Sequence, residues 1–320
     1  MFQNMQMILN STQVSYFILG AYSDNPILKD CYFIILLIAY IVIVISNVFL
    51  IVLICVNRSL HEPMYLFLCS LFVNQLYGST GLFPFLLLQI PRDVHTVSVP
   101  LCFLQIFCVY TYATVEFAIL SAMSYDRYLA ICHPLQYHTQ MTYGRVVQFT
   151  AVTWLFPFLS VVIVISLSSP LHLCGNIIDK IYCNNYSIVK LSCSDTTVNN
   201  IYGLMNLFIT ICVPVMLILY TYMRILTVCF SGSKQTRHKA VSTCTPHLAS
   251  ILNFAFGCCF EIVQSRFNMN HVPHILRIFL SVYFITLQPI FNPLVFGLKM
   301  SKIRLVCSNV LCGKRHLDLI

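Results

Sequence analysis

The sequence predicts an all-α membrane protein built as one bundle of seven transmembrane helices. Of its 320 residues, 58% are apolar and only 9% are charged, and the mean hydropathy is +0.82. A soluble domain carries about 25% charged residues, so this chain must use lipid as part of its solvent. Its apolar runs are long and nearly unbroken, whereas the strands of a membrane β-barrel alternate in polarity over about ten residues. The sequence therefore excludes a barrel.

Each spanning helix needs about 20 mostly apolar residues. Seven segments meet this requirement, at 31–56, 64–90, 99–126, 146–168, 199–228, 240–263 and 274–298. They leave residues 1–30 as an N-terminal tail, 31–298 as one transmembrane domain, and 299–320 as a short C-terminal tail that can form an amphipathic helix.

The distribution of basic residues predicts the orientation of the bundle. Lys and Arg are twice as frequent in the loops that face inward if the N-terminus lies outside. The positive-inside rule therefore predicts an extracellular N-terminus and a cytoplasmic C-terminus. These bases are scattered over short loops rather than gathered in one domain, so no nucleic-acid partner is expected. The start of the chain is not basic and has no small-residue cleavage site, so no cleaved signal peptide is expected.

The third segment connects the two faces of the membrane. From Cys102 to Arg127 the chain is long enough, at about 1.5 Å per residue, to cross a hydrocarbon core of roughly 30 Å. Asp126, Arg127 and Tyr128 follow its apolar part, and such an ionic triplet is costly in lipid and should lie at the membrane boundary. From the residues alone, Arg127 is equally a cation that reaches lipid headgroups and a switch residue held by Asp126.

One acidic residue, Glu116, lies deep in this third segment. An ionisable residue inside the membrane predicts a functional site. Asn47, Gln75 and Asn292 lie at matching depths on the first, second and seventh segments, and with Glu116 they can form a polar network that holds water or a sodium ion. The alternative is a protonated Glu116 that is hydrogen-bonded to one neighbour.

Four cysteines, Cys102, Cys174, Cys183 and Cys193, belong to the predicted outer face. An even set in an oxidising compartment indicates two disulfides, for which three pairings are possible. A zinc site is improbable, because neither a CxxC motif nor a paired histidine lies nearby. Asn10 begins an Asn-Ser-Thr sequon on the outer tail and is a candidate glycosylation site.

Seven sequence features occur in register with the helices: PMYLFL at 63–68, MSYDRYLAICHPLQY at 123–137, Trp154, KLSCSDTTVNN at 190–200, TYMRIL at 221–226, KAVSTCTPHL at 239–248 and PIFNPLVF at 289–296. In these features and their order the chain resembles the odorant receptors, a branch of the rhodopsin-like (class A) G-protein-coupled receptors. LYG at 76–78 and IDKIYCNN at 178–185 are similar to fish members of that family.

The resemblance implies a plasma membrane receptor, not an enzyme, that binds a small organic odorant in the outer half of the bundle. It implies the pairs Cys102–Cys183 and Cys174–Cys193. It also implies coupling to a heterotrimeric G protein of the olfactory stimulatory type, with a switch region comprising Asp126, Arg127, Tyr128, Tyr222, Arg237, Lys239, Asn292 and Pro293.

The ligand site follows partly from helical spacing and partly from the resemblance. Val109, Tyr110, Ala113, Thr114 and Phe117 share one helical face, a pattern that by itself more often indicates helix packing. The resemblance places this face against the odorant cavity. It also places Arg266 where some family members hold an acidic ligand.

The chain departs from the family pattern at four positions. Gln75 replaces the usual Asp, Ser46 replaces Gly, Pro246 replaces Ser, and Phe296 replaces Tyr. Gln75 removes a carboxylate from the polar cluster, and Phe296 removes a hydroxyl that family members use in the active state. These differences concern sodium sensitivity and coupling efficiency rather than the fold.

Three other function classes fit the sequence less well. A transporter would place ionisable residues along a central path or contain an inverted repeat, and neither is visible. A membrane enzyme would need clustered nucleophile, base or metal ligands, and no HExxH or GxSxG motif occurs. A non-olfactory class A receptor is the closest alternative, although Val109 lacks the acid that amine receptors carry there. Cys307 and Cys312 are palmitoylation candidates or chance occurrences.

Overall fold

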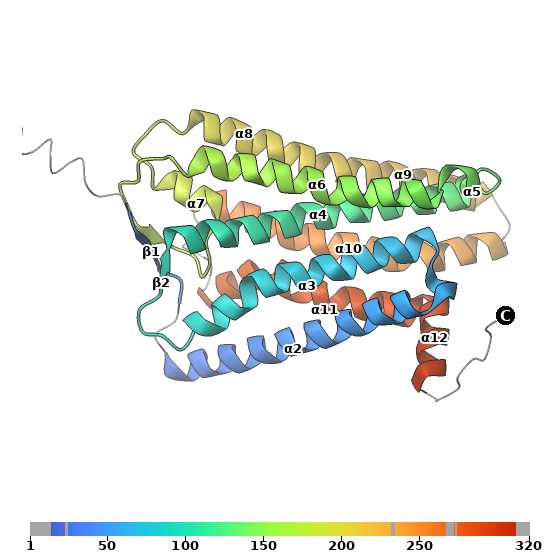
Figure 1. Cartoon of the computed structure of the whole chain (residues 1–320), viewed down its shortest axis with the longest axis horizontal. Coiled ribbons are helices and arrows are strands. Elements are labelled where there is room, and N and C mark those ends of the chain that lie inside the picture. The colour runs from blue at the N-terminus through green and yellow to red at the C-terminus, as the bar shows by residue number, and fades with distance from the viewer. Residues whose placement is uncertain (1–13, 23–24, 232–233, 267–271, 273, 312–320) are drawn as a thin grey trace, which may run out of the picture.

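A computed structural model describes residues 14–22, 25–231, 234–266, 272 and 274–311, with the backbone alone at 231–243, 274–275 and 310–311. Long helices run side by side along the long axis of the molecule (Figure 1). Seven are long and apolar enough to cross a membrane, which confirms the predicted fold class. They are α2 (Pro26–Val56), α3 (Pro63–Gln89), α4 (Val99–Cys132), α6 (Tyr143–Ser168), the continuous segment α8 (Thr197–Leu207), η2 (Phe208–Cys212) and α9 (Val213–Ser231), α10 (Lys234–Arg266) and α11 (His274–Lys299).

Shorter elements close the two ends of the bundle. One end carries both disulfides and is called the disulfide end below; the other carries Arg127 and is called the Arg127 end. The short elements are the strands β1 (Tyr16–Leu19), β2 (Thr96–Ser98) and β3 (Ile177–Ile178), the 3₁₀ turn η1 (Arg58–Leu60), and the helices α5 (Tyr137–Gln140), α7 (Asn185–Lys190) and α12 (Ser301–Leu311).

Capping residues explain where several helices begin. The Asn25 side chain accepts the backbone N–H groups of Ile27 and Leu28, and Pro26 occupies the first turn, where its missing N–H costs nothing. As a result α2 begins before residue 31, within the segment expected to be a tail. Thr142 caps α6 and Asn184 caps α7 in the same way.

Helix α4 is longer than expected. It was predicted to end near residue 126, but it continues to Cys132, and His133 and Pro134 follow. The ring of Pro134 disfavours the helical conformation at His133, the residue before it, so the helix stops at Cys132 rather than at the end of the apolar run. The Asp126–Arg127–Tyr128 triplet therefore lies inside the last turns of a regular helix.

Helix α4 is the centre of the bundle and packs against α3, α6, α9 and α10. Its contact with α3 depends on two glycines. A Cβ atom at Gly78 would lie 2.4 Å from the Tyr112 ring, and one at Gly81 would lie 2.6 Å from Cys108. Real Cβ atoms do not approach so closely, so these glycines set the spacing of the two helices.

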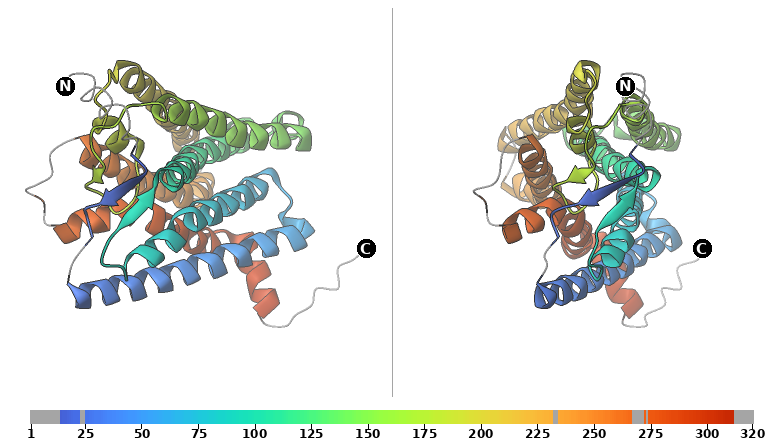
Figure 2. Two further views of the ribbon diagram at one scale, coloured as in Figure 1. Left: turned by 60° about the vertical axis from the view of Figure 1, so that its left-hand side comes forward. Right: turned by 90° about the vertical axis from the view of Figure 1, so that its left-hand side faces the viewer.

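A three-stranded sheet covers the disulfide end, and the sequence did not predict it. Strand β1 is central, pairing antiparallel with β2 and parallel with β3. Figure 2 shows this sheet seated across the end of the bundle. Phe17 and Leu19 of β1 are buried, so this part of the expected N-terminal tail belongs to the packed domain.

Prolines interrupt two of the spanning helices. The π-helical turn η2 ends at Cys212, two residues before Pro214, whose missing N–H interrupts the regular hydrogen-bond ladder. Pro289 and Pro293 lie inside α11. The sequence-predicted amphipathic helix of the C-terminal tail corresponds to α12, which packs against α11 and buries Ile303.

Candidate functional site

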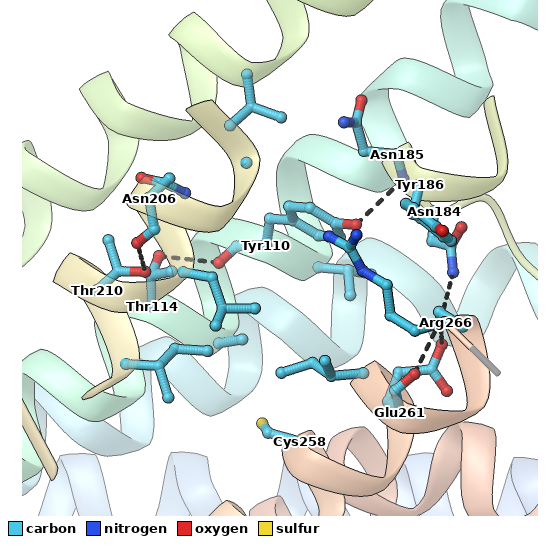
Figure 3. A pocket seen from close by; sticks show the side chains of 18 of the residues that line it. Tyr110, Thr114, Asn184, Asn185, Tyr186, Asn206, Thr210, Cys258, Glu261 and Arg266 are labelled. Carbon is cyan, nitrogen blue, oxygen red and sulfur yellow. Dashed lines mark hydrogen bonds between the residues drawn. The ribbon is translucent and has the colours of Figure 1, made fainter. Parts of the chain in front are cut away.

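The bundle contains a cavity of about 170 Å³ toward its disulfide end (Figure 3). An engineered cavity of similar volume holds benzene, so the space suits a small organic molecule. Its walls come from α4, α6, α7, α8, η2, α10 and α11 and from the loop that carries Cys183. The cavity therefore exists only where these helices and this loop pack together, and each helix forms one part of its wall.

Five of the six sequence-predicted ligand residues line this cavity: Val109, Tyr110, Ala113, Thr114 and Arg266. The prediction for Phe117 is wrong. Phe117 lies one helical turn beyond Ala113 and is fully buried, with its ring centroid 4.9 Å from that of Phe254. Aromatic packing between α4 and α10 fills the space there, so Phe117 belongs to the core next to the cavity.

Sequence analysis named no residue on two walls of the cavity. One is the loop between α6 and α8 with its helix α7, and it contributes Tyr182, Asn184, Asn185, Tyr186 and Val189. The other is the polar face of α8 and η2, and it contributes Asn199, Asn200, Gly203, Asn206, Leu207 and Thr210. Glu261 of α10 is a further lining residue that the sequence analysis did not name. The cluster of asparagines between 184 and 206 is a signal that could have identified them.

Both disulfides implied by the resemblance are present, Cys102–Cys183 and Cys174–Cys193. The first joins the start of α4 to the loop above the cavity, and the Cys183 N–H donates to the Gln105 side chain at 3.1 Å. The second closes the loop on itself next to a bridge between Leu173 and Ser192. These bonds hold the loop as the outer wall of the cavity.

The two charged side chains that line the cavity, Glu261 and Arg266, have different kinds of partner. Glu261 forms an ion pair with Lys180, whose Nζ lies 2.9 Å from the Glu261 Oε1. Arg266 instead places its guanidinium over the Tyr186 ring, 4.1 Å from the centroid, and Lys190 lies over the same ring at 4.8 Å. Within the described residues, Arg266 has no carboxylate partner. Among the described residues, Arg266 is thus a guanidinium at the cavity wall with an aromatic contact and no carboxylate partner.

Asn185 begins another sequon, Asn185-Tyr186-Ser187, on the disulfide end of the bundle. Its side chain is only 8% exposed and lines the cavity, and its backbone N–H donates to the Tyr110 hydroxyl at 3.2 Å. A glycan at this position would have to occupy the cavity wall. Asn10, the candidate glycosylation site of the N-terminal tail, lies outside the described residues.

A second polar site lies at the middle of the bundle around Glu116, which is fully buried. Four side-chain amides donate to its carboxylate, namely Asn74 at 2.9 Å, Gln75 at 3.2 Å, Gln288 at 3.3 Å and Asn292 at 3.1 Å. The structure thus joins Gln75 and Asn292 to Glu116, as the sequence predicted, and adds Asn74 and Gln288. Gln288 lies one turn before Asn292 on the same face of α11, a spacing that could have identified it.

Asn47 does not join this set. Its amide donates to the backbone carbonyls of Ile43 at 2.8 Å and Pro289 at 2.9 Å. The Pro289 carbonyl is available because the helix is interrupted by Pro293, which has no N–H to donate to it. Asn47 therefore fixes α2 to the kinked part of α11 rather than contacting Glu116.

At the Arg127 end, Arg127 is held by its neighbour Asp126, with Nε at 3.1 Å and Nη2 at 2.5 Å from the Asp126 Oδ2. The other carboxylate oxygen of Asp126 accepts the Tyr137 hydroxyl at 2.8 Å. Burial and the Asp126 carboxylate both raise the pKa of Tyr137, so the phenol stays protonated and acts as the donor. Asp126 is thus the acceptor for both a cation and a phenol.

The remaining predicted switch residues lie on four helices. Tyr222 of α9 hydrogen-bonds His247 of α10, a partner that the sequence did not predict. Tyr128 bonds His133 at 3.0 Å and does not contact Asp126. Asn292 and Pro293 lie in α11, near Glu116 rather than near Arg127. Arg237 and Lys239 lie in α10, but their side chains fall outside the described part of the chain, as does the whole of Cys312.

Comparison with known proteins gives concordant results. A family model described as olfactory receptor matches residues 36–314. Human olfactory receptor 10A6 is 33% identical over 297 residues, covering 92% of this chain and 94% of that protein. Human olfactory receptor 52B2 is 36% identical over 267 residues, covering 83% of this chain and 82% of that protein. The structure of squid rhodopsin is similar in fold, with a TM-score of 0.75 at 16% identity, covering 97% of this chain and 93% of that chain.

Proposed function

Because the chain belongs to the olfactory receptor family, we propose that it is an odorant receptor whose ligand is a small organic anion held by Arg266. It is a multi-pass protein of the plasma membrane that binds a small molecule and couples to a heterotrimeric G protein, and it is not an enzyme. The specific ligand class, the membrane orientation and the type of G protein are parts of the proposal.

The observation that carries the ligand class is the Arg266 guanidinium at the cavity, which has no carboxylate partner among the residues that the structure describes. A carboxylate can accept two parallel N–H groups from one guanidinium, and such charge-assisted bonds are the stronger ones. The one acidic group that lines the cavity, Glu261, already has a cationic partner in Lys180. A cationic ligand would therefore meet Arg266 without a free carboxylate to bind it.

The orientation follows the distribution of bases, with the disulfide end outside and the Arg127 end in the cytoplasm. Disulfides persist in an oxidising compartment, which supports the same assignment. The Asn10 sequon then lies outside, where it can be glycosylated. The G protein is of the olfactory stimulatory type, so activation raises cyclic AMP.

Helix α10 connects the ligand to the cytoplasmic face. It carries Arg266 and Glu261 at the cavity and His247, which bonds Tyr222, nearer the other end. A ligand shifts the receptor between two states only by its difference in affinity for them. An anion that draws Arg266 inward favours one position of α10, and the resulting displacement at His247 opens the cytoplasmic end around Arg127.

Replacing Arg266 with glutamine should weaken the response to carboxylate odorants by about 10- to 100-fold, because a charge-assisted hydrogen bond is worth roughly 1.5–3 kcal/mol. The measurement is cyclic AMP in cells, with short-chain carboxylates compared against the matching alcohols. Arg92→Gln is the matched control, because Arg92 is an exposed arginine at the same end that does not line the cavity. An unchanged carboxylate response in Arg266→Gln, or a response to a hormone or peptide but to no odorant, contradicts the proposal.

A sodium ion near Glu116 is a further part of the proposal. Sodium takes oxygen ligands, and this site has one buried carboxylate. The amide oxygens of Asn74 and Gln75 are also buried and have no hydrogen-bond partner. Rotation of either amide exchanges its nitrogen for its oxygen, so the residues fit a cation. No group of three His, Cys, Asp or Glu side chains suited to a metal occurs in the described part of the chain.

Sodium should lower agonist potency several-fold in the wild-type receptor, and Glu116→Gln should remove this dependence. The isosteric amide keeps the size of the side chain but removes its charge, so the attraction for a cation is lost. The measurement is the agonist dose-response at about 0.15 M sodium against the same concentration of choline, at constant ionic strength. Equal sodium dependence in the variant and in wild type would rule out Glu116 as the ion's ligand.

A further inference from the structure

The far wall of the ligand cavity contains two threonines, Thr114 of α4 and Thr210 of η2, and both side chains are more than nine-tenths buried. Helix α4 and the turn η2 pack against each other. In Figure 3 both hydroxyl groups lie at the same end of the cavity, and the Arg266 guanidinium lies on the other side of Tyr110. The cavity therefore has two distinct polar ends.

The hydrogen of each threonine hydroxyl is already used inside its own helix. The Thr114 hydroxyl donates to the Tyr110 carbonyl at 2.9 Å, and the Thr210 hydroxyl donates to the Asn206 carbonyl at 2.8 Å. A hydroxyl has one hydrogen and two lone pairs. Both oxygens are thus left with acceptor capacity alone.

The Arg266 end has the opposite character. A guanidinium has five N–H donors and no acceptor. The Tyr110 hydroxyl beside it accepts the Asn185 N–H, so its own hydrogen is directed elsewhere. Arg266 thus supplies donors to a ligand on one side of Tyr110, and the two threonine oxygens supply acceptors on the other. Glu261, which is paired with Lys180, lies beside Arg266, and the Asn206 amide, which can donate and accept, lies beside Thr210.

From the placement of Arg266 and the two threonines we infer that the ligand is an acid that carries a hydrogen-bond donor at the end opposite its carboxylate, such as an ω-hydroxy acid or an ω-amino acid. The inference rests on the proposed function, because Arg266 must hold the acidic group. The carboxylate accepts from Arg266, and the distal hydroxyl or amine donates to Thr114 and Thr210. A plain fatty acid fills the same space, but its terminal methyl cannot make these bonds.

Hexanoate and 5-hydroxypentanoate are suitable probes, because they differ by exchange of a terminal methyl for a hydroxyl at constant chain length. A hydroxyl buried without a partner loses its bonds to water and binds more weakly than a methyl. The wild-type receptor should nevertheless respond to 5-hydroxypentanoate at the same or lower concentration than to hexanoate. A hexanoate preference of tenfold or more would overturn the inference.

The double variant Thr114→Val, Thr210→Val keeps the shape of both side chains and removes both oxygens. It should weaken the response to 5-hydroxypentanoate by about tenfold and leave the hexanoate response within about twofold. Thr153→Val is the matched control, because Thr153 is also a buried threonine that donates to its own helix, at Thr150, but it does not line the cavity. A parallel loss for both acids in the double variant contradicts the assignment of the donor end.

Separate measurements test the acidic group at Arg266 and the donor end at the two threonines. Arg266→Gln should reduce the responses to both acids equally and leave their ratio unchanged. If neither acid activates the wild-type receptor, the acidic ligand is wrong, and hexan-1-ol and pentane-1,5-diol replace the acids as a matched neutral pair. The donor end is then supported only if the double variant weakens the response to the diol alone, and equal effects on both alcohols overturn it.

Discussion

Replacing Arg127 with alanine should abolish ligand-evoked cyclic AMP, with a loss of more than about 30-fold, while the receptor still reaches the cell surface. In the structure Asp126 holds the Arg127 guanidinium through two hydrogen bonds, so in this conformation Arg127 is engaged within the bundle rather than by a G protein. In the proposed mechanism, opening of the bundle exposes Arg127 to the G protein. Removing one partner of a buried, hydrogen-bonded charge pair costs roughly 2–5 kcal/mol, which gives the expected size of the loss.

The measurement pairs cyclic AMP with surface labelling of an epitope at the N-terminus. Arg145→Ala is the matched control, because Arg145 is an exposed arginine at the start of α6, at the same end of the bundle, and forms no ion pair with the described residues. Asp126→Asn should act in the opposite direction and raise signalling without ligand, because it weakens the hold on Arg127. Normal signalling in Arg127→Ala would refute the switch role of Arg127.

Replacing Cys102 with serine should produce the largest loss of folded receptor. The Cys102–Cys183 bond closes a separation of 81 residues, against 19 for Cys174–Cys193. In the chain-entropy account a disulfide that closes 100 residues contributes about 4.7 kcal/mol and one that closes 15 contributes about 3 kcal/mol, so the longer bond matters more. Its loss also releases the loop wall of the cavity from α4.

Surface delivery and binding after mild heating measure this effect. Cys102→Ser should abolish surface delivery or ligand response, whereas Cys174→Ser should reduce them by a smaller amount. Cys31→Ser is the control, because Cys31 is an exposed free cysteine on α2 that takes part in neither bond. Wild-type behaviour in Cys102→Ser would show that the sheet and loop packing hold the disulfide end without the covalent bond.

The predicted helices correspond closely to the structure because helix formation in a membrane is a local matter. Each apolar run must satisfy its own backbone hydrogen bonds in lipid, so composition and length place all seven spans. The differences occur at helix ends, where a cap or a proline decides. The Asn25 cap starts α2 at Pro26, before the predicted residue 31. Pro134 ends α4 after Cys132, beyond the predicted residue 126.

The polar network around Glu116 was predictable in part. An acid inside an apolar helix is conspicuous, and Gln75 and Asn292 lie at the right depth to reach it. Depth alone does not fix the direction of a side chain. Asn47 lies at the same depth but bonds the Pro289 carbonyl, which only the kink in α11 places beside it.

The sequence by itself determined that this chain is a seven-helix receptor, which family it resembles, and which cysteines, ionic residues and prolines are unusual in lipid. Each of these features is visible in one segment of the chain. Only the tertiary structure decided the cavity: that Phe117 faces Phe254, that Lys180 neutralises Glu261 while Arg266 has no carboxylate partner in the described residues, and that Thr114 and Thr210 share one wall. These relations depend on how separate helices and a disulfide-bound loop pack together, and packing is not encoded in the spacing of residues along any one of them.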